Sequence, residues 1–115
     1  MRRLDEVDIL TPDEIRLLTD LKQRILAVAP GASVTLYGSA ARGERTSESD
    51  YDVLVLLRAR ISREEERRLH DLAYDLELER DVVLSLAIYT ADMWEQPAMR
   101  GSPYRKSVLI EGIAV

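Results

Sequence analysis

The sequence predicts a small α/β domain, also describable as α+β, in which helices flank a mixed β-sheet. Two segments carry apolar residues at helical spacing behind a capping box, three short segments are rich in Val, Leu and Ile, and helical and strand patterns alternate along the chain. We expect a single domain over residues 1–115 with a tail over 1–10, because this length suits one hydrophobic core and is too short for two ordinary ones.

The first helix is expected to begin at Thr11-Pro12. Thr11 can cap the helix, Pro12 suits its first position, and Glu14 completes a capping box. Pro30-Gly31 ends the pattern. One buried face follows from the apolar residues at steps of three and four, which are Leu18, Leu21, Ile25 and Val28.

Two strands are expected on either side of a Gly-Ser turn. Residues 32–37 alternate in polarity and end at Gly38-Ser39. The second strand covers residues 50–57, and its apolar run from Val53 to Leu57 predicts burial on both faces.

The second half of the chain predicts a helix, a strand and further helices. Ser62 and Glu65 form another capping box, and residues 82–89 read as a third strand. Thr90 can cap a short turn, and Ser102-Pro103 begins a last helix that Gly112 ends. The buried side of the middle helix is predicted to contain Leu69, Leu72, Ala73 and Leu76.

Composition limits the possible partners. The net charge is −5, and the 14 arginines are interleaved with acidic residues, which argues against nucleic acid as the primary partner. No signal peptide is expected at the start, and the longest apolar run is far shorter than a membrane span, so no membrane partner is expected. The lack of cysteine excludes disulfides and thiolate sites and fits a cytoplasmic location.

Asp50 and Asp52 are the first candidates for chemistry. Aspartate is depleted in strands, and two aspartates at positions i and i+2 point to the same face, with Cα atoms roughly 6.6 Å apart. Two like charges that close are unfavourable unless a cation lies between them. Mg²⁺ suits such a pair because it binds carboxylate and phosphate oxygens.

The Gly38-Ser39 turn supplies groups suited to phosphate. Gly38 lets a ligand approach the backbone, and the amides of Ser39 and Ala40 would open a short helical segment. The Ser39 hydroxyl can donate to a phosphate oxygen, and Arg42 can approach phosphate or pair with a carboxylate. Taken alone, the turn is ordinary loop chemistry and the Asp-Tyr-Asp segment is a solvated loop end or a helix cap. Their combination, in this order, predicts a nucleotidyl-transfer site.

Residues 36–57 resemble the signature of the polymerase-β-like nucleotidyltransferase superfamily, through Gly38-Ser39-x-Ala41-Arg42-Gly43 and Ser49-Asp50-x-Asp52-Val53. Among its members, the chain looks most like the minimal nucleotidyltransferases. The resemblance implies a palm-like fold. It also implies that Gly38 and Ser39 hold the phosphates of ATP, that Asp50 and Asp52 bind one or two Mg²⁺ ions, and that Arg42 corresponds to a recurrent arginine.

The resemblance further implies a third carboxylate on the next strand, which would bind metal and act as the general base. Asp81 is the candidate, and we expect it to begin the third strand and to share a face with Val83 and Ser85. The sequence departs from the family pattern here, because Arg80 stands where an apolar residue is usual. Asp81 alternatively caps a turn, in which case the chain would bind nucleotide but transfer it poorly.

The resemblance also implies a partner. Minimal nucleotidyltransferases are commonly paired with a small helical toxin of the HEPN type and attach AMP to one of its tyrosines. The expected function is therefore that of an adenylyltransferase and antitoxin. One alternative is a non-catalytic module that neutralises a partner by binding; another is an antibiotic-type nucleotidyltransferase with its acceptor pocket at a homodimer interface. Tyr104 and Arg105 could contact either nucleotide or partner.

Overall fold

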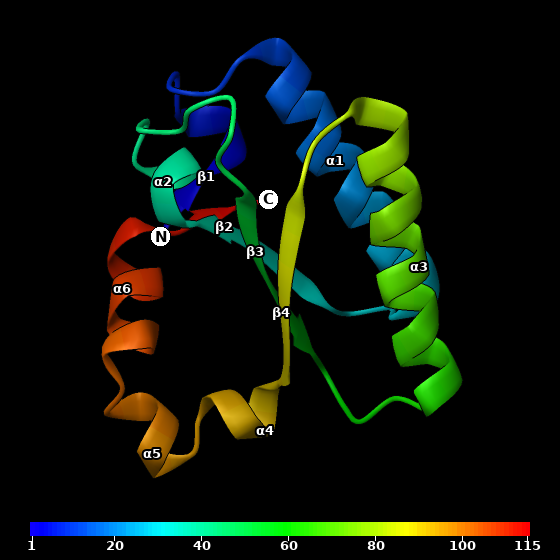
Figure 1. Ribbon diagram of the computed structural model, residues 1–115. Helices are drawn as coiled ribbons and strands as arrows, with labels where there is room; N and C mark the ends of the chain where they lie inside the picture. Colours follow the sequence, from blue (N-terminus) through cyan, green and yellow to red (C-terminus); the bar gives the residue numbers. More distant parts are fainter.

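A mixed sheet of five strands lies at the centre of the molecule (Figure 1). The computed structural model describes all residues, 1–115. The strand order is β1-β5-β2-β3-β4; β2 runs antiparallel to both of its neighbours, while the β1–β5 and β3–β4 pairs are parallel. The strands are β1 Arg2–Arg3, β2 Ser33–Tyr37, β3 Tyr51–Leu57, β4 Leu84–Thr90 and β5 Ile113–Ala114.

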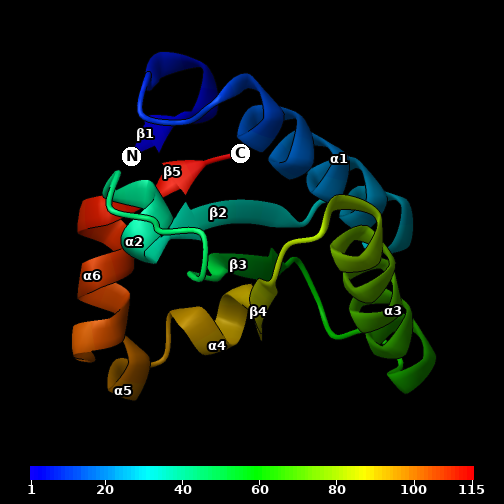
Figure 2. The same cartoon turned by 45° about the horizontal axis from the view of Figure 1, so that its top comes forward.

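The helices cover the two faces of the sheet unequally (Figure 2). Two long helices, α1 Pro12–Val28 and α3 Arg63–Arg80, lie side by side on one face. The other face is covered by three shorter helices, which are α4 Ala91–Trp94, α5 Pro97–Arg100 and α6 Pro103–Glu111. A one-turn helix, α2 Gly38–Ala41, joins β2 to the loop before β3, and a 3-10 turn, Leu4–Glu6, follows β1. The expected α/β class with helices flanking a mixed sheet is confirmed.

The predicted helix starts are confirmed in detail. Thr11 and Glu14 exchange hydrogen bonds of 3.1 and 2.9 Å at the start of α1, and Ser62 and Glu65 form the same capping box on α3. The apolar stripe of α1 faces the sheet, since Leu18, Leu21 and Ile25 are fully buried. Local sequence therefore specifies where both long helices begin and which side each one buries.

Strand β3 separates two hydrophobic cores. Val53 and Val55 point into the main core beneath α1 and α3, while Leu54 packs with Trp94 and Val108 on the opposite face. The predicted burial of this strand on both faces is thus confirmed. Because side chains alternate along a strand, Asp52 lies on the same face as Leu54.

Several predicted boundaries are wrong. Residues 1–10 are more than a tail, because they contain β1 and the 3-10 turn, and residues 113–114 form a strand, β5, that was not predicted. The third strand begins at Leu84, two residues later than expected, and α5 was not predicted. Two-residue strands carry no periodic pattern, so only their pairing partners reveal them.

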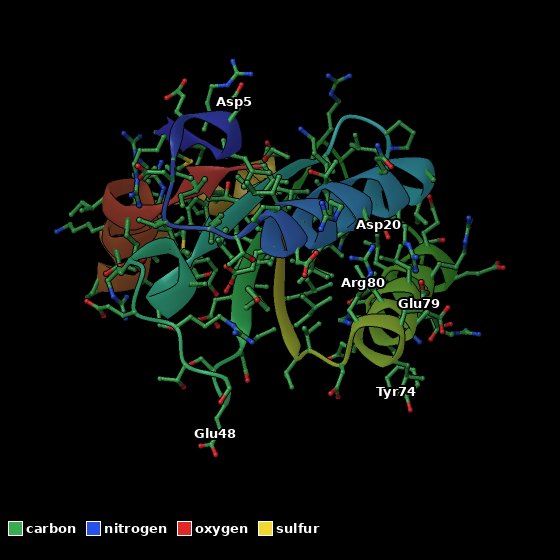
Figure 3. All side chains as sticks on the ribbon, turned by 90° about the horizontal axis from the view of Figure 1, so that it is seen from above. Asp5, Asp20, Glu48, Tyr74, Glu79 and Arg80 are labelled. Atoms are coloured by element: carbon green, nitrogen blue, oxygen red, sulfur yellow. The ribbon has the colours of Figure 1, made fainter.

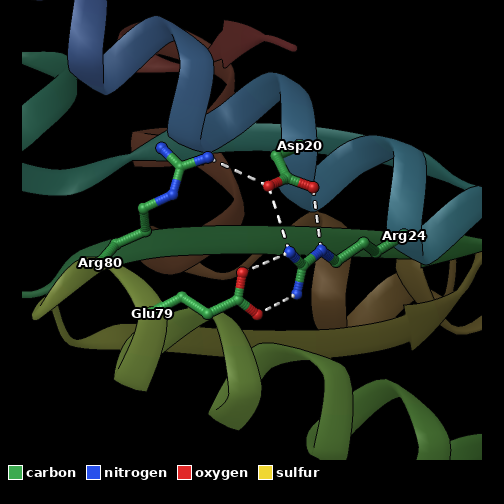
Figure 4. A network of polar contacts seen from close by, with 4 residues as sticks. All are labelled: Asp20, Arg24, Glu79 and Arg80. Atoms are coloured by element: carbon green, nitrogen blue, oxygen red, sulfur yellow. Dashed lines mark hydrogen bonds and ion pairs between the residues drawn. The ribbon is translucent and has the colours of Figure 1, made fainter.

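Helices α1 and α3 are joined by a network of charged side chains (Figure 4). The Arg24 guanidinium donates to Asp20 at 2.9 Å and to Glu79 at 2.8 and 2.9 Å, and Arg80 donates to Asp20 at 3.1 Å. Seen from above, Asp20, Glu79 and Arg80 lie together on the side of the molecule away from α6 (Figure 3). No helix is both long enough and apolar enough to cross a membrane.

Candidate functional site

The turn between β2 and α2 lies directly beside the start of β3. Tyr37, the last residue of β2, is paired with Asp52 in the antiparallel ladder. The chain then turns away at Gly38 and forms α2, so the Gly-Ser turn begins next to the Asp52 carboxylate. The two halves of the predicted signature are brought together by strand pairing.

Gly38 is required by both its backbone and its surroundings. Its φ of +76° lies in the left-handed region, which residues with a Cβ adopt at a cost. A Cβ on Gly38 would also overlap the carboxylate of Asp52. The absence of a side chain at position 38 therefore lets the Asp52 carboxylate lie against the backbone of the turn.

Asp50 and Asp52 carry charges that no cation of the protein neutralises by direct pairing, since the ion pairs of the molecule involve other residues. Asp50 is exposed just before β3, and Asp52 is partly buried within it. Burial raises the pKa of Asp52, the charges of Asp50 and Glu111 raise it further, and Arg42 opposes them. Two oxygen-rich, mutually repelling carboxylates fit a hard divalent cation that takes its remaining ligands from water and phosphate.

The loop that carries Asp50 is anchored at its base. The Arg45 guanidinium lies over the ring of Tyr51 at 4.1 Å, and the Tyr51 hydroxyl donates to Glu14 on α1 at 2.8 Å. Tyr51 faces away from Asp52, as the strand alternation predicts. A cavity of about 380 Å³ lies on that far side and is bordered by Glu14, Arg45 and Tyr51. Neither Asp50 nor Asp52 borders it, so it is separate from the acidic pair.

Arg42 lies at the end of α2 with its guanidinium held by two carboxylates. Its Nε donates to Glu44 at 3.0 Å and its Nη1 donates to Glu111 at 3.0 Å. These hydrogen bonds, first to Glu44 and then to Glu111, raise the pKa of Arg42. Ser39 is only partly buried at the start of α2. The structure thus brings Gly38, Ser39, Arg42 and the aspartate pair together where β2 ends and β3 begins.

Asp81 lies outside the strand that the sequence predicts for it. The expectation that it begins the third strand is wrong, because Asp81 is the exposed C-cap of α3 with a left-handed φ of 53°. In the parallel β3–β4 ladder, Ser85 is the residue paired with Asp52. Aspartate tolerates this backbone conformation better than most residues, which explains its presence at the cap. Its role as a third metal ligand stays a prediction.

Sequence reasoning missed two residues that other elements bring to Asp52. One is Glu111 at the end of α6, and the other is Tyr37, whose hydroxyl accepts from that of Tyr104 at 3.2 Å. Tyr104 belongs to a packed aromatic group with Tyr89 and Trp94. These contacts span 67 residues or more for Tyr104 and Glu111, so no local pattern could have revealed them.

Arg105, whose role the sequence left open, faces the same aromatic group. Its guanidinium donates to Glu95 at 3.1 Å and lies over the Trp94 ring at 5.5 Å. In this structure it therefore stabilises the packing of α6 on α4.

Comparisons with known proteins identify a family and two fold neighbours. The family model of the nucleotidyltransferase domain matches residues 14–115. The protein MJ0141 of Methanocaldococcus jannaschii, named as a putative protein adenylyltransferase, is 38% identical over 56 residues, which are 49% of this chain. That match covers 57% of the length of MJ0141, so the two proteins are alike over about half of each.

Two solved structures share the fold. A crystal structure of a toxin-antitoxin with AMP-PNP superposes with a TM-score of 0.54 at 19% identity, covering 83% of this chain and 69% of the other. A crystal structure of a mutant toxin-antitoxin MntA-HpeT gives a TM-score of 0.51 at 22% identity, covering 92% and 72%. The family match extends over nearly the whole chain and includes every residue of the acidic pair and the Gly-Ser turn. The chain belongs to the nucleotidyltransferase domain family.

Proposed function

We propose that this protein transfers AMP from Mg-ATP to a tyrosine hydroxyl of a small helical toxin of the HEPN type, and that it acts as an antitoxin by doing so. The observation that carries the proposal is the close approach of the Gly38 turn to Asp52, beside the unpaired Asp50. The turn that we assign to phosphate and the acidic pair that we assign to metal thus meet where β2 ends and β3 begins.

Asp50 and Asp52 are assigned to hold one or two Mg²⁺ ions against the phosphates of ATP. When bound, Mg²⁺ supplies charge neutralisation to the triphosphate and to the leaving pyrophosphate. The acceptor oxygen forms a bond with the α-phosphorus, the bond between that phosphorus and the bridging oxygen breaks, and pyrophosphate leaves with the bonding electrons. The proton of the acceptor hydroxyl passes to solvent.

Ser39 and Arg42 are assigned to the nucleotide phosphates. The Ser39 hydroxyl lies at the start of α2 and makes no hydrogen bond to another group of the protein. Two nitrogens of the Arg42 guanidinium are occupied by carboxylates, which leaves Nη2 to donate to a phosphate oxygen.

A protein acceptor is favoured over a small molecule or nucleic acid. The relative from Methanocaldococcus jannaschii bears a protein adenylyltransferase name, and both fold neighbours are toxin–antitoxin structures, one of them containing AMP-PNP. The net charge of −5 disfavours a nucleic-acid acceptor, because proteins bind nucleic acids largely through the negatively charged phosphates.

The direct test is the intact mass of the neighbouring gene's product after incubation with this protein, Mg²⁺ and ATP. We expect the mass of one added AMP with the wild type and none with the D50N/D52N double variant. The matched control is E48Q, which removes a carboxylate from the exposed tip of the same loop (Figure 3) and should transfer normally.

Three outcomes would revise the proposal. Transfer by the double variant would contradict the metal role of Asp50 and Asp52. A stable complex with no added mass would favour a non-catalytic antitoxin that neutralises by binding. An unmodified protein partner together with AMP attached to an aminoglycoside would favour the antibiotic-type activity.

A further inference from the structure

The end of α6 lies opposite the Gly-Ser turn because of the strand pairing that follows it. Leu36 of β2 pairs with Ile113 of β5, and Thr35 pairs with Ala114. Continuing this antiparallel register by two residues sets Gly38 across from Glu111. The sheet therefore places the last residue of α6 beside the turn, although 73 residues separate the two in sequence.

The Glu111 carboxylate contacts the turn through both of its oxygens. Oε1 accepts the backbone N–H of Gly38 at 2.9 Å, and Oε2 accepts Nη1 of Arg42 at 3.0 Å. One side chain thus replaces the ladder hydrogen bond that Gly38 would otherwise make and fixes the guanidinium one helical turn further on. Both contacts involve a charge, and such hydrogen bonds are stronger than neutral ones.

Burial separates Glu111 from the other carboxylate that contacts Arg42. The Glu111 side chain is 17% exposed, whereas that of Glu44 is 65% exposed. Water and salt screen the Glu44 contact, and exposed pairs of this kind contribute little. The orientation of the Arg42 guanidinium therefore depends mainly on Glu111.

The backbone of Glu111 is held as well as its side chain. The Arg2 guanidinium donates to the Glu111 carbonyl at 2.7 Å and to the Ala41 carbonyl at 3.0 Å. Arg2 thereby ties the end of α6 to the end of α2. A residue fixed at both its backbone and its carboxylate is suited to holding a neighbouring group in one orientation.

We propose that Glu111 is a positioning residue of the nucleotide site, which holds Gly38 and aims the free Nη2 of Arg42 at the phosphates of the bound nucleotide. The inference rests on the proposed function in one respect, which is that ATP binds at this turn. Glu111 acts through Arg42 and the turn and does not itself contact the nucleotide.

The test compares ATP affinity across a small set of variants, by isothermal titration calorimetry with and without Mg²⁺. We expect E111A to weaken ATP binding about tenfold and E111Q to weaken it less, because the amide keeps a neutral acceptor for the Gly38 N–H. The matched control, E44A, removes the exposed carboxylate from the same guanidinium and should change the dissociation constant less than about twofold.

A double-mutant cycle distinguishes positioning from a general structural role. If Glu111 acts through Arg42, E111A should weaken ATP binding clearly less in the R42A background than in the wild type. Thermal melting of each variant shows whether it is folded, and E111Q serves as the second variant if E111A does not fold.

Several results would overturn the inference. Equal effects of E111A and E44A, or full additivity of E111A with R42A, would show that Glu111 does not position the guanidinium. Tighter ATP binding by E111A would show that the carboxylate competes with phosphate. A wild type that binds ATP but never transfers AMP would refute the proposed catalysis while leaving the inference standing, whereas one that binds no ATP would refute both.

Discussion

Two groups of charged residues in this protein differ in how their charges are satisfied. Between α1 and α3, the carboxylates of Asp20 and Glu79 are paired with arginines at 2.8 to 3.3 Å, and the network holds two helices together (Figure 4). At the start of β3, Asp50 and Asp52 lie close to one another and to Glu111 without a paired cation. Hydrogen bonds between opposite charges raise the pKa of Arg24 and lower that of Glu79, whereas burial, and then repulsion by Asp50, raise the pKa of Asp52.

The contrast indicates that the paired network contributes to stability, whereas the unpaired aspartates are suited to binding a ligand. A paired network is satisfied within the protein and has no capacity left for a ligand. Repulsion between unpaired carboxylates lowers the stability of the fold without a ligand. Binding of a cation removes this repulsion and restores the stability. The four predictions below test that separation.

The largest expected effect comes from placing a Cβ at the junction of the turn and the acidic pair. Gly38→Ala combines a left-handed φ with overlap on the Asp52 carboxylate. We expect AMP transfer to fall on the order of 100-fold and the free energy of unfolding to fall by roughly 1–3 kcal/mol. The control is Gly101→Ala, where φ is −83° and the added atom meets its neighbour at an ordinary 3.6 Å. Equal effects at both positions, measured by transfer rate and urea unfolding, would contradict the structure.

Breaking the paired network should alter stability alone. Arg24→Gln removes the bidentate contacts to Asp20 and Glu79, and we expect a loss of roughly 1 kcal/mol in the free energy of unfolding, smaller at high salt. Arg16→Gln, on the same helix but in a more exposed pair, is the control and should be nearly neutral. Transfer should be unchanged in both variants. A fall in the kcat of Arg24→Gln would show that the two groups are coupled.

Removing a charge from the unpaired aspartates should have the opposite effect on the free energy of unfolding. Because the pKa of Asp52 is raised in the folded state, the stability linked to its protonated form is present at low pH and is lost as pH rises through that pKa. Asp52→Asn should therefore be at least as stable as the wild type at pH 7, with the difference vanishing at a pH below about 4. Added Mg²⁺ should stabilise the wild type and not the variant in thermal melts. A variant less stable than the wild type at pH 7 without Mg²⁺ would show that Asp52 is structurally required.

The smallest effect is expected at Asp81. It is exposed at the end of α3, where it borders a cavity together with Glu48 and Ser49, and asparagine also tolerates its left-handed backbone. Asp81→Asn should change the transfer rate less than about twofold, because Asp81 caps a helix and is not among the residues that we assign to Mg²⁺ and the nucleotide. A loss comparable to that of Asp52→Asn, in a variant that melts normally, would show that Asp81 is brought to the metal after all.

The position of Asp81 depends on contacts that local sequence does not specify. The sequence places this aspartate just before an apolar run, which is where the family pattern has a strand residue. The structure ends α3 at Arg80, uses Asp81 as the cap and starts the strand at Leu84. Whether a residue at such a junction belongs to the helix or the strand depends on the β3–β4 register, which pairs Asp52 with Ser85 and which no local signal specifies.

The sequence by itself determined the elements that depend on neighbours along the chain. The capping boxes of α1 and α3, the apolar face of α1, the doubly buried β3 and the order of Gly38, Ser39, Asp50 and Asp52 all follow from spacing. Only the tertiary structure decided that β5 pairs with β2 and so brings Glu111 to Gly38. The physical reason is range: capping and periodicity act over three or four residues, whereas strand pairing joins groups more than 70 residues apart through a register fixed by the whole core.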